Sequence, residues 1–274
     1  MSMFCDVDLA ARIERAEAEL MEATSRAAGR RRGDGSAFAL ALAGGVASFA
    51  EAESPFNKIA GLGFAGTPPG ADLDRVERAF AAAGSPVQAE VATLGDPAIG
   101  ELLTRRGYRL VSFENVLGRP LSDLPATAPT AGIEIRPSGD DPYEALVADA
   151  TATADTQGVP SHEDFDRDVL VNAMRDLTES GVRRWLALLD GVPAGGGSMR
   201  IAGTIAQLTG AATSPAHRRR GVQTALLAAR LAEAAAAGCE VAVVTTQPGS
   251  RSQQNVQRTG FDLLYTRAIL LRHS

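Results

Sequence analysis

Apolar and polar residues follow one another along this chain in patterns that predict alternating helices and strands. In residues 6–28 the apolar side chains recur at helical spacing, Asp6 or Asp8 provides the N-cap, and Gly29 is expected to end the helix. Short extended runs bounded by glycine and proline predict strands. The further elements expected in this first part are two strands within 37–52 around Gly44-Gly45, a strand at 57–64, a helix from Asp72 to Ala83, a strand at 87–94, a helix at 97–106 and a strand at 108–117.

A segment rich in proline, serine, threonine and alanine, residues 120–131, predicts an extended linker. We place a domain boundary there, so the pattern predicts an α/β protein with domains 1–122 and 123–274. Gly195-Gly196-Gly197 is interpreted as the tip of a hairpin. The elements expected after the linker are a strand at 133–136, helices at 143–154 and 165–178, strands at 183–189, 198–201 and 204–213, a helix between Gly221 and Gly238, a strand at 241–246, a helix at 250–258 and a strand at 263–271.

The ends of the two parts resemble each other. Gly107 and Gly260 each end a predicted helix before an aromatic residue, and they lie 153 residues apart. The same offset matches further pairs, among them Thr93 with Thr246 and Arg105 with Arg258, so both parts are expected to end in the same strand-helix-strand unit. Because glycine after a helix is a common stop signal, a chance match of two ordinary αβ units remains an alternative.

Composition and charge narrow the class of protein. The 274 residues are 45% hydrophobic and 22% charged, and no stretch reaches the roughly 18 apolar residues of a membrane span. Acidic residues among the first 20 argue against a secretory signal, so we expect a cytoplasmic protein. Cys5 and Cys239 are too far apart in sequence to suggest a zinc motif or a disulfide framework. The net charge of -6 disfavours nucleic acid as a partner.

The most informative segment is residues 204–238, in which a strand, a loop and an alanine-rich helix follow one another. The loop contains Arg218-Arg219-Arg220-Gly221 immediately before the helix. Free backbone amides and the dipole at a helix N-terminus favour a phosphate or pyrophosphate group. The loop lacks both the lysine motif of a P-loop and the GxGxxG pattern of dinucleotide-binding proteins.

This segment resembles the acyl-CoA loop of the GNAT acetyltransferase superfamily, which has the pattern Arg/Gln-x-x-Gly-x-Gly/Ala after the fourth strand. The matching residues are 218–223, and Asn255 to Phe261 lie where the family has equivalent features. The resemblance covers about the last 145 residues and is fainter in the first half. It implies two GNAT-like domains, each with a mixed, mostly antiparallel central sheet flanked by helices, the first of them degenerate.

The resemblance also implies a site. The strands 204–213 and 241–246 would separate and admit the thioester of acetyl-CoA, and a backbone amide near Ala212 or Thr213 would polarise its carbonyl. No metal is implied. Ser252 and Asn255 are equally compatible with a cofactor contact and with an ordinary helix surface. The residues expected to bind the cofactor are Ala211, Ala212, Thr213, Arg218, Arg219, Arg220, Gly221, Val222, Gln223, Thr224, Ser252 and Asn255.

Three positions depart from the family pattern. Gln223 replaces a small residue, Gln207 stands where some members carry a glutamate base, and Val256 stands where a tyrosine often protonates the leaving thiolate. An amide cannot accept a proton as a base does. The candidates that replace these groups are Tyr265 and Glu114, with Asp190, His162 and Glu163 as further alternatives.

The first half has two prolines and no arginine between its strand at 57–64 and the helix that follows, so it is not expected to bind CoA. By analogy with tandem proteins of the superfamily, it is expected to shape the acceptor pocket, with Glu90, Glu114 and Asn115 as the polar residues of interest.

The sequence therefore predicts an enzyme that transfers an acetyl group from acetyl-CoA directly to the amine of an unidentified acceptor. A non-catalytic protein that binds or senses acyl-CoA is the alternative, because Gln207 and Val256 remove the two most familiar proton-transfer groups. A nucleic-acid binder that uses the arginine run is a weaker alternative. Either a monomer or a homodimer is compatible with the sequence.

Overall fold

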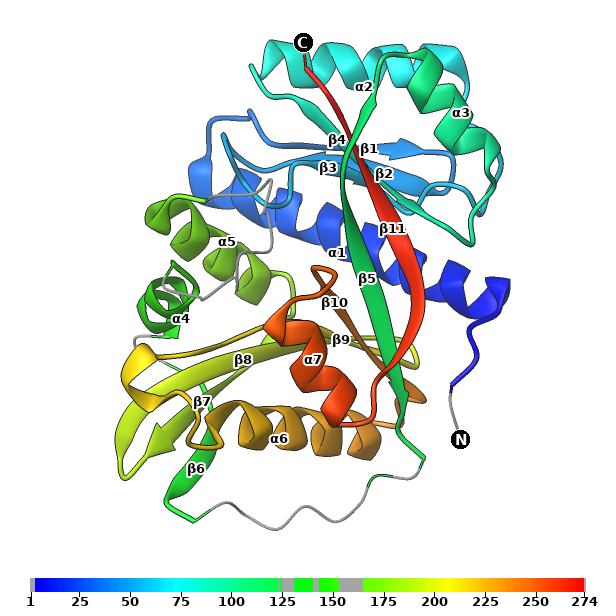
Figure 1. Cartoon of the computed structure of the whole chain (residues 1–274). Coiled ribbons are helices and arrows are strands. Elements are labelled where there is room, and N and C mark those ends of the chain that lie inside the picture. The colour runs from blue at the N-terminus through cyan, green and yellow to red at the C-terminus, as the bar shows by residue number, and fades with distance from the viewer. Residues whose placement is uncertain (1–2, 123, 125–130, 140–142, 153–164, 274) are drawn as a thin grey trace.

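The computed structural model describes residues 3–122, 124, 131–139, 143–152 and 165–273. These residues form a mixed sheet of 11 strands in the order β1-β2-β3-β4-β11-β5-β10-β9-β8-β7-β6 (Figure 1). Most of the predicted linker and residues 153–164, which include His162 and Glu163, lie outside the described residues. Among the described residues no helix combines the length and apolar character needed to cross a membrane.

The N-terminal half supplies five strands and three helices. They are, in chain order, α1 (Val7–Arg32), β1 (Phe38–Leu42), β2 (Gly45–Phe49), β3 (Lys58–Ala60), α2 (Gly70–Ala82), β4 (Val87–Ala92), α3 (Ala98–Arg105) and β5 (Arg109–Pro120). The C-terminal half supplies the rest. They are β6 (Ile133–Pro137), α4 (Tyr143–Ala152), α5 (Arg167–Glu179), β7 (Arg183–Leu189), β8 (Val192–Ala202), β9 (Ile205–Thr213), the 3-10 turn η1 (Pro215–His217), α6 (Val222–Ala236), β10 (Val241–Thr246), α7 (Arg251–Arg258) and β11 (Asp262–Arg272).

The predicted repeat is confirmed by these boundaries. Helices α3 and α7 begin and end 153 residues apart, and β5 and β11 begin at the same offset. The two closing strands are exchanged between the halves. β11 pairs with β4 of the N-terminal half, while residues 115–120 of β5 pair with β10 of the C-terminal half, and β5 and β11 pair with each other. The sheet is therefore continuous across the predicted boundary at residue 122.

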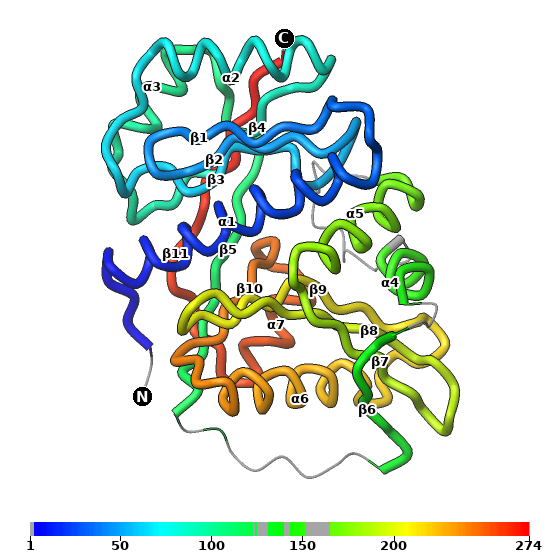
Figure 2. The backbone as a smooth tube through the Cα atoms, turned by 180° about the vertical axis from the view of Figure 1, so that it is seen from behind, coloured from blue at the N-terminus to red at the C-terminus, as the bar shows by residue number. Residues whose placement is uncertain are grey.

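Helix α1 lies between the two parts of the sheet. Figures 1 and 2 show it crossing the molecule with β1–β4 on one side and β8–β10 on the other, next to α5. Its buried residues include Ala18 and Met21, which pack with the N-terminal strands, and Ala10 and Ile13, which pack with Ile205 of β9. Helix α6 covers the outer face of the C-terminal strands, where its leucines form the largest apolar cluster with β7–β10.

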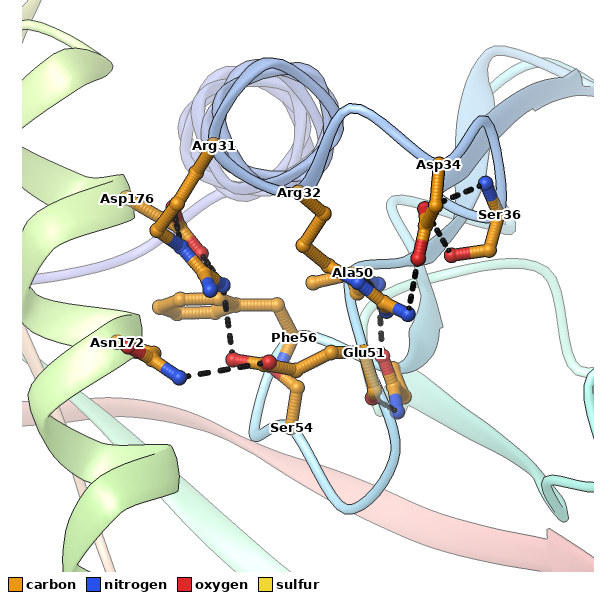
Figure 3. Close-up of polar contacts among 11 residues, drawn as sticks. Arg31, Arg32, Asp34, Ser36, Ala50, Glu51, Ser54, Phe56, Asn172 and Asp176 are labelled. Atoms are coloured by element: carbon orange, nitrogen blue, oxygen red, sulfur yellow. Dashed lines mark hydrogen bonds and ion pairs between the residues drawn. The ribbon is translucent and has the colours of Figure 1, made fainter.

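A network of charges fastens α1 to α5 (Figure 3). Arg31 on α1 donates two hydrogen bonds of 2.9 Å to the carboxylate of Asp176 on α5 and one of 2.8 Å to Glu51, which follows β2. Asn172 of α5 reaches the other oxygen of Glu51 at 3.5 Å. A bidentate arginine–carboxylate pair fixes distance and orientation, so this contact helps set how the halves meet.

The strand expected at 57–64 is only Lys58–Ala60, and three other predicted boundaries were also wrong. Helix α1 continues through Gly29 to Arg32 and ends at Gly33, which has the left-handed φ of 68°. Helix α2 begins at Gly70 after Pro69 and is not capped by Asp72. The third error is the hairpin tip, which is at Asp190-Gly191, both with positive φ, while the three glycines 195–197 lie inside β8.

Those strand glycines are explained by close packing on both faces of β8. A Cβ atom on Gly196 would lie 2.6 Å from the Tyr143 ring of α4, and one on Gly197 would lie 3.1 Å from the guanidinium of Arg230 on α6. Arg230 is 3% exposed and donates to the carbonyls of Leu226, Ser198 and Gly210. Burial lowers the pKa of this guanidinium to about 10. The glycines therefore make room for α4 and for a buried arginine.

Candidate active site

Strands β9 and β10 separate partway along their length, as predicted. Their parallel pairing consists of three residue pairs and ends at Gln207 and Val243. At the same point β9 carries a bulge against β8, because Ser198 pairs with Gly210 and Arg200 with Gln207. Beyond Gln207 the edge of β9 that faces β10 carries no pairing to that strand. We call the space between these diverging strands the wedge.

The three predicted residues at the end of β9 line one edge of the wedge. Ala211, Ala212 and Thr213 pair with β8 through their other edge. The Ser214 amide donates to the Ala194 carbonyl on β8 at 2.9 Å. Because backbone amides alternate in direction along a strand, the Thr213 amide points away from β8 toward the β10 side. Thr213 is therefore better placed than Ala212 to present an amide to a ligand in the wedge.

The loop after β9 leads from the wedge to the start of α6. Arg219 and Gly221 both have positive φ values, 62° and 86°, and Gly221 is the N-cap residue of α6. No side chain caps this helix, so the amides of its first turn lack the partners that a capping side chain would supply. A turn of this kind, followed by an uncapped helix N-terminus, is suited to an anionic group.

The three arginines of the loop have different surroundings. The Arg218 side chain turns back and donates to the carbonyls of Thr213 and Ala150, both at 3.3 Å. Arg219 is exposed. Arg220 is also exposed and lies 3.4 Å from the Asp190 carboxylate at the tip of the β7–β8 hairpin. Two guanidinium groups therefore remain at the surface beside the uncapped amides.

Helix α7 approaches the same loop. The Asn255 side chain donates to the side-chain oxygen of Gln223 at 2.9 Å, so these two predicted residues are in contact. Thr224 and Ser252 are exposed on their helices, and Val222 is buried in the core beneath the loop. Val256 is 5% exposed within that core, so it belongs to the packing of α7 against the sheet.

The two predicted catalytic residues lie away from the loop, in a cluster of buried charges behind the wedge. The Tyr265 hydroxyl donates to Glu14 of α1 at 2.7 Å, and Arg267 donates to the same oxygen at 2.7 Å. Burial and the Glu14 carboxylate raise the pKa of Tyr265 well above its usual value. Glu114 lies 3.9 Å from Arg267. The other predicted polar residues of the first half are Glu90, which is bonded to Lys58 and Arg267, and Asn115, which accepts from Thr266.

Two acidic residues of α1 were missed by the sequence analysis. Glu14 is 1% exposed, and Glu17, one turn later, is half-buried and accepts a hydrogen bond of 3.2 Å from the Gln207 side chain. Both lie on the face that carries Ala10 and Ile13, so their spacing was the available signal. Charged residues of a helix usually face solvent, and this general tendency argued against the signal from the spacing.

Comparison with known proteins agrees with this geometry. The model of the Acetyltransferase (GNAT) family matches residues 143–261. A search of the curated proteins found no match.

Solved structures with the same fold cover both halves. A GCN5-related N-acetyltransferase from Kribbella flavida is 20% identical with a TM-score of 0.61, over 92% of this chain and 96% of that one. A tandem GNAT protein from the clavulanic acid biosynthesis pathway is 15% identical with a TM-score of 0.55, over 73% and 68% of the two chains. Residues 143–261 thus match the GNAT acetyltransferase family, and the chain as a whole has the fold of these solved structures, one of which is a tandem GNAT protein.

Proposed function

We propose that this protein is an N-acetyltransferase that moves an acetyl group from acetyl-CoA to the amine of an acceptor within a ternary complex. The observation that carries the proposal is the wedge, which opens at Gln207 and Val243 and leads to the uncapped N-terminus of α6. Separated strands offer a backbone edge to an extended ligand arm, and a helix N-terminus attracts a pyrophosphate.

The residues around the wedge suit the parts of acetyl-CoA. Amides of the loop and the first turn of α6, with Arg219 and Arg220, would hold the pyrophosphate. The free edge of β9 would pair with the pantetheine arm. The Thr213 amide is the donor we assign to the thioester carbonyl, where it would stabilise negative charge as the amine attacks.

We assign the N-terminal half, residues 1–122, to shaping the acceptor side. Its equivalent of the CoA loop leads to α2 through Pro69, which has no amide to donate. The half reaches the C-terminal site through α1, which packs against β9.

A non-catalytic acyl-CoA sensor remains the second candidate. It is favoured by Gln207, which has no basic group, and by Val256, which is buried where the family often has a tyrosine. Both candidates bind acetyl-CoA, and turnover with an amine distinguishes them.

The cofactor site is tested by calorimetric titration of acetyl-CoA into the wild type and into Gly221→Asp. A carboxylate at the N-cap, in a residue forced to positive φ, would repel the pyrophosphate and disturb the loop. We expect the wild type to bind and the variant to lose at least tenfold in affinity, which corresponds to about 1.4 kcal/mol.

Gly238→Asp is the matched control. Gly238 follows the other end of α6, has a φ of 80°, and has open space around its Cβ position. It therefore introduces the same strain and charge far from the loop, and it should bind as the wild type does. Equal binding by Gly221→Asp and Gly238→Asp would contradict the assignment of residues 218–224.

A further inference from the structure

Helix α1 brings a carboxylate of the N-terminal half to the base of the wedge. The Gln207 side chain is 5% exposed and lies where the pairing of β9 with β10 ends. Its amide nitrogen donates to Glu17 at 3.2 Å, and its oxygen accepts from Arg200 of β8 at 3.0 Å. Arg200 also donates to the Ala16 carbonyl of α1 at 3.1 Å, so the helix is fixed against this point of the sheet.

Glu17 and the loop that would bind acetyl-CoA approach the wedge from different sides. Gln207 faces α1, as do Ile205 and Val243, whereas the neighbouring Ala206 and Leu208 pack against α6. Because side chains alternate across a sheet, Glu17 lies on the face opposite α6. An acceptor that entered from the α1 side would meet the wedge with Glu17 beside it.

The other carboxylates of the cluster are engaged by cations. Glu14 accepts from Arg267 and Tyr265, and Glu90 contacts both Lys58 at 2.5 Å and Arg267 at 3.3 Å. A carboxylate paired with a cation is a weak base. The hydrogen bond that Glu17 accepts comes instead from the neutral amide of Gln207, which leaves the Glu17 carboxylate the better proton acceptor.

The charged and titratable groups around Glu17 come from six elements. They are Glu14 on α1, Lys58 on β3, Glu90 on β4, Glu114 on β5, Arg200 on β8, and Arg267 with Tyr265 on β11. Desolvation raises the pKa of Glu17, Arg267 and Lys58 oppose it, and Glu90 and Glu14 add to it. A raised pKa makes a carboxylate a stronger base once it is ionised.

We propose that Glu17 is the general base of the reaction and takes the proton of the acceptor's ammonium group. The inference rests on the proposed function and deepens it, because it assigns to the N-terminal half the role that Gln207 cannot perform. Gln207 becomes a positioning residue, which holds the carboxylate through its amide. The substrate class that follows is a primary amine that arrives in its protonated form.

The proton balance is complete without another reactant. Glu17 takes one proton from the ammonium nitrogen, and the neutral amine then forms a bond to the thioester carbonyl carbon. The carbon–sulfur bond breaks, and the departing thiolate receives the second proton from the same nitrogen. The proton held by Glu17 returns to solvent, so acetyl-CoA and the ammonium form give the acetamide, CoA and one released proton.

The test compares kcat and kcat/KM as functions of pH for the wild type, Glu17→Gln and Glu17→Asp. The probes are acetyl-CoA and a panel of primary alkylamines, amino acids and amino sugars, with release of the CoA thiol as the signal. We expect wild-type kcat/KM to fall as the pH drops through the pKa of Glu17. Glu17→Gln should lower kcat by about 10²–10⁴-fold and abolish this acidic limb. Glu17→Asp should keep the limb at a reduced rate.

Two measurements separate a catalytic role from a structural one. Acetyl-CoA affinity, measured by calorimetry, should be the same in Glu17→Gln and the wild type. Glu22→Gln is the matched control, because Glu22 lies on α1 and pairs with Arg26 at the surface. It should have the wild-type pH profile.

Two contrary results are possible, and they separate an error in the role of Glu17 from an error in the proposed function. An acidic limb that persists in Glu17→Gln, whatever the rate, would overturn the assignment of Glu17 while the proposed function stands. Binding of acetyl-CoA by the wild type without turnover of any amine in the panel would overturn both the role of Glu17 and the proposed acetyltransferase activity. The non-catalytic acyl-CoA sensor would then be the remaining candidate.

Discussion

At the residue scale, the chemistry of the candidate site depends on which half of the chain supplies each group. Gln207 lies where some members of the GNAT family carry a glutamate base, and its amide contacts a carboxylate of α1. A base beside Gln207 can therefore come from α1 and does not have to be a residue of β9. The position was predicted from the sequence, but its partner was not, because Glu17 is 190 residues away in the chain.

The raised pKa of Glu17 predicts how its ionisation affects stability. The folded state holds this proton more tightly than the unfolded chain does, so its contribution to stability is lost as the pH rises from about 4.5 through the folded pKa. Glu17→Gln removes that loss. We expect the free energy of unfolding of the variant, relative to the wild type, to increase with pH over this window in denaturant titrations. A difference that is constant with pH would contradict the prediction.

At the element scale, α1 determines how the two parts of the sheet are held. Its C-terminal turn is bonded to α5 through Arg31 and Asp176, and its first turns pack against β9 and β11. The hydrogen bonds to Asp176 raise the pKa of Arg31 further above its usual value, so this guanidinium stays charged.

Asp176→Ala should weaken this attachment. The Asp176 side chain is 2% exposed, and its loss would leave Arg31 with Glu51 as its remaining acidic partner in Figure 3. We expect the free energy of unfolding to fall by about 2 kcal/mol, as for the loss of hydrogen bonds to a charged group. Glu179→Ala, an exposed acidic residue of the same helix, should change it by less than about 0.5 kcal/mol in the same urea titration. Equal effects of the two substitutions would contradict the role given to Asp176.

Local features of the fold could be predicted from the sequence, and features that depend on distant parts of the chain could not. The ranges of β7 and β10 and the start of α6 after Gly221 were predicted from periodicity and glycine, because those signals act within a few residues. The error at glycines 195–197 has the opposite cause. Their function is to admit α4 and Arg230 from elsewhere in the chain, and a local pattern cannot distinguish such packing from a turn.

At the scale of the whole molecule, the exchange of β5 and β11 makes the two halves depend on each other. β4 and β5 of the N-terminal half are separated by β11, so the sheet of that half is incomplete without the C-terminal half. The repeat was visible in the sequence, but the exchange was not. Either strand order satisfies the same alternation of apolar residues.

A fragment of residues 1–122 is therefore predicted not to fold as a monomer. Without β11, β4 has no neighbour on one side and would expose an unpaired edge. We expect the isolated fragment to aggregate or self-associate in size-exclusion chromatography. Co-expression with residues 131–274 should recover a complex with the size and circular dichroism of the intact protein. A monomeric, cooperatively folding 1–122 fragment would contradict the prediction.

The strand exchange also has a consequence for synthesis on the ribosome. The strand that completes the N-terminal sheet begins at Asp262, long after β4 and β5 have left the ribosome. A domain that is translated first usually folds first. Here the first half must wait, with the edge of β4 open, until the second half has been made. Its nascent chain is thus a natural client for chaperones, and the speed of translation through the C-terminal half sets how long that exposure lasts.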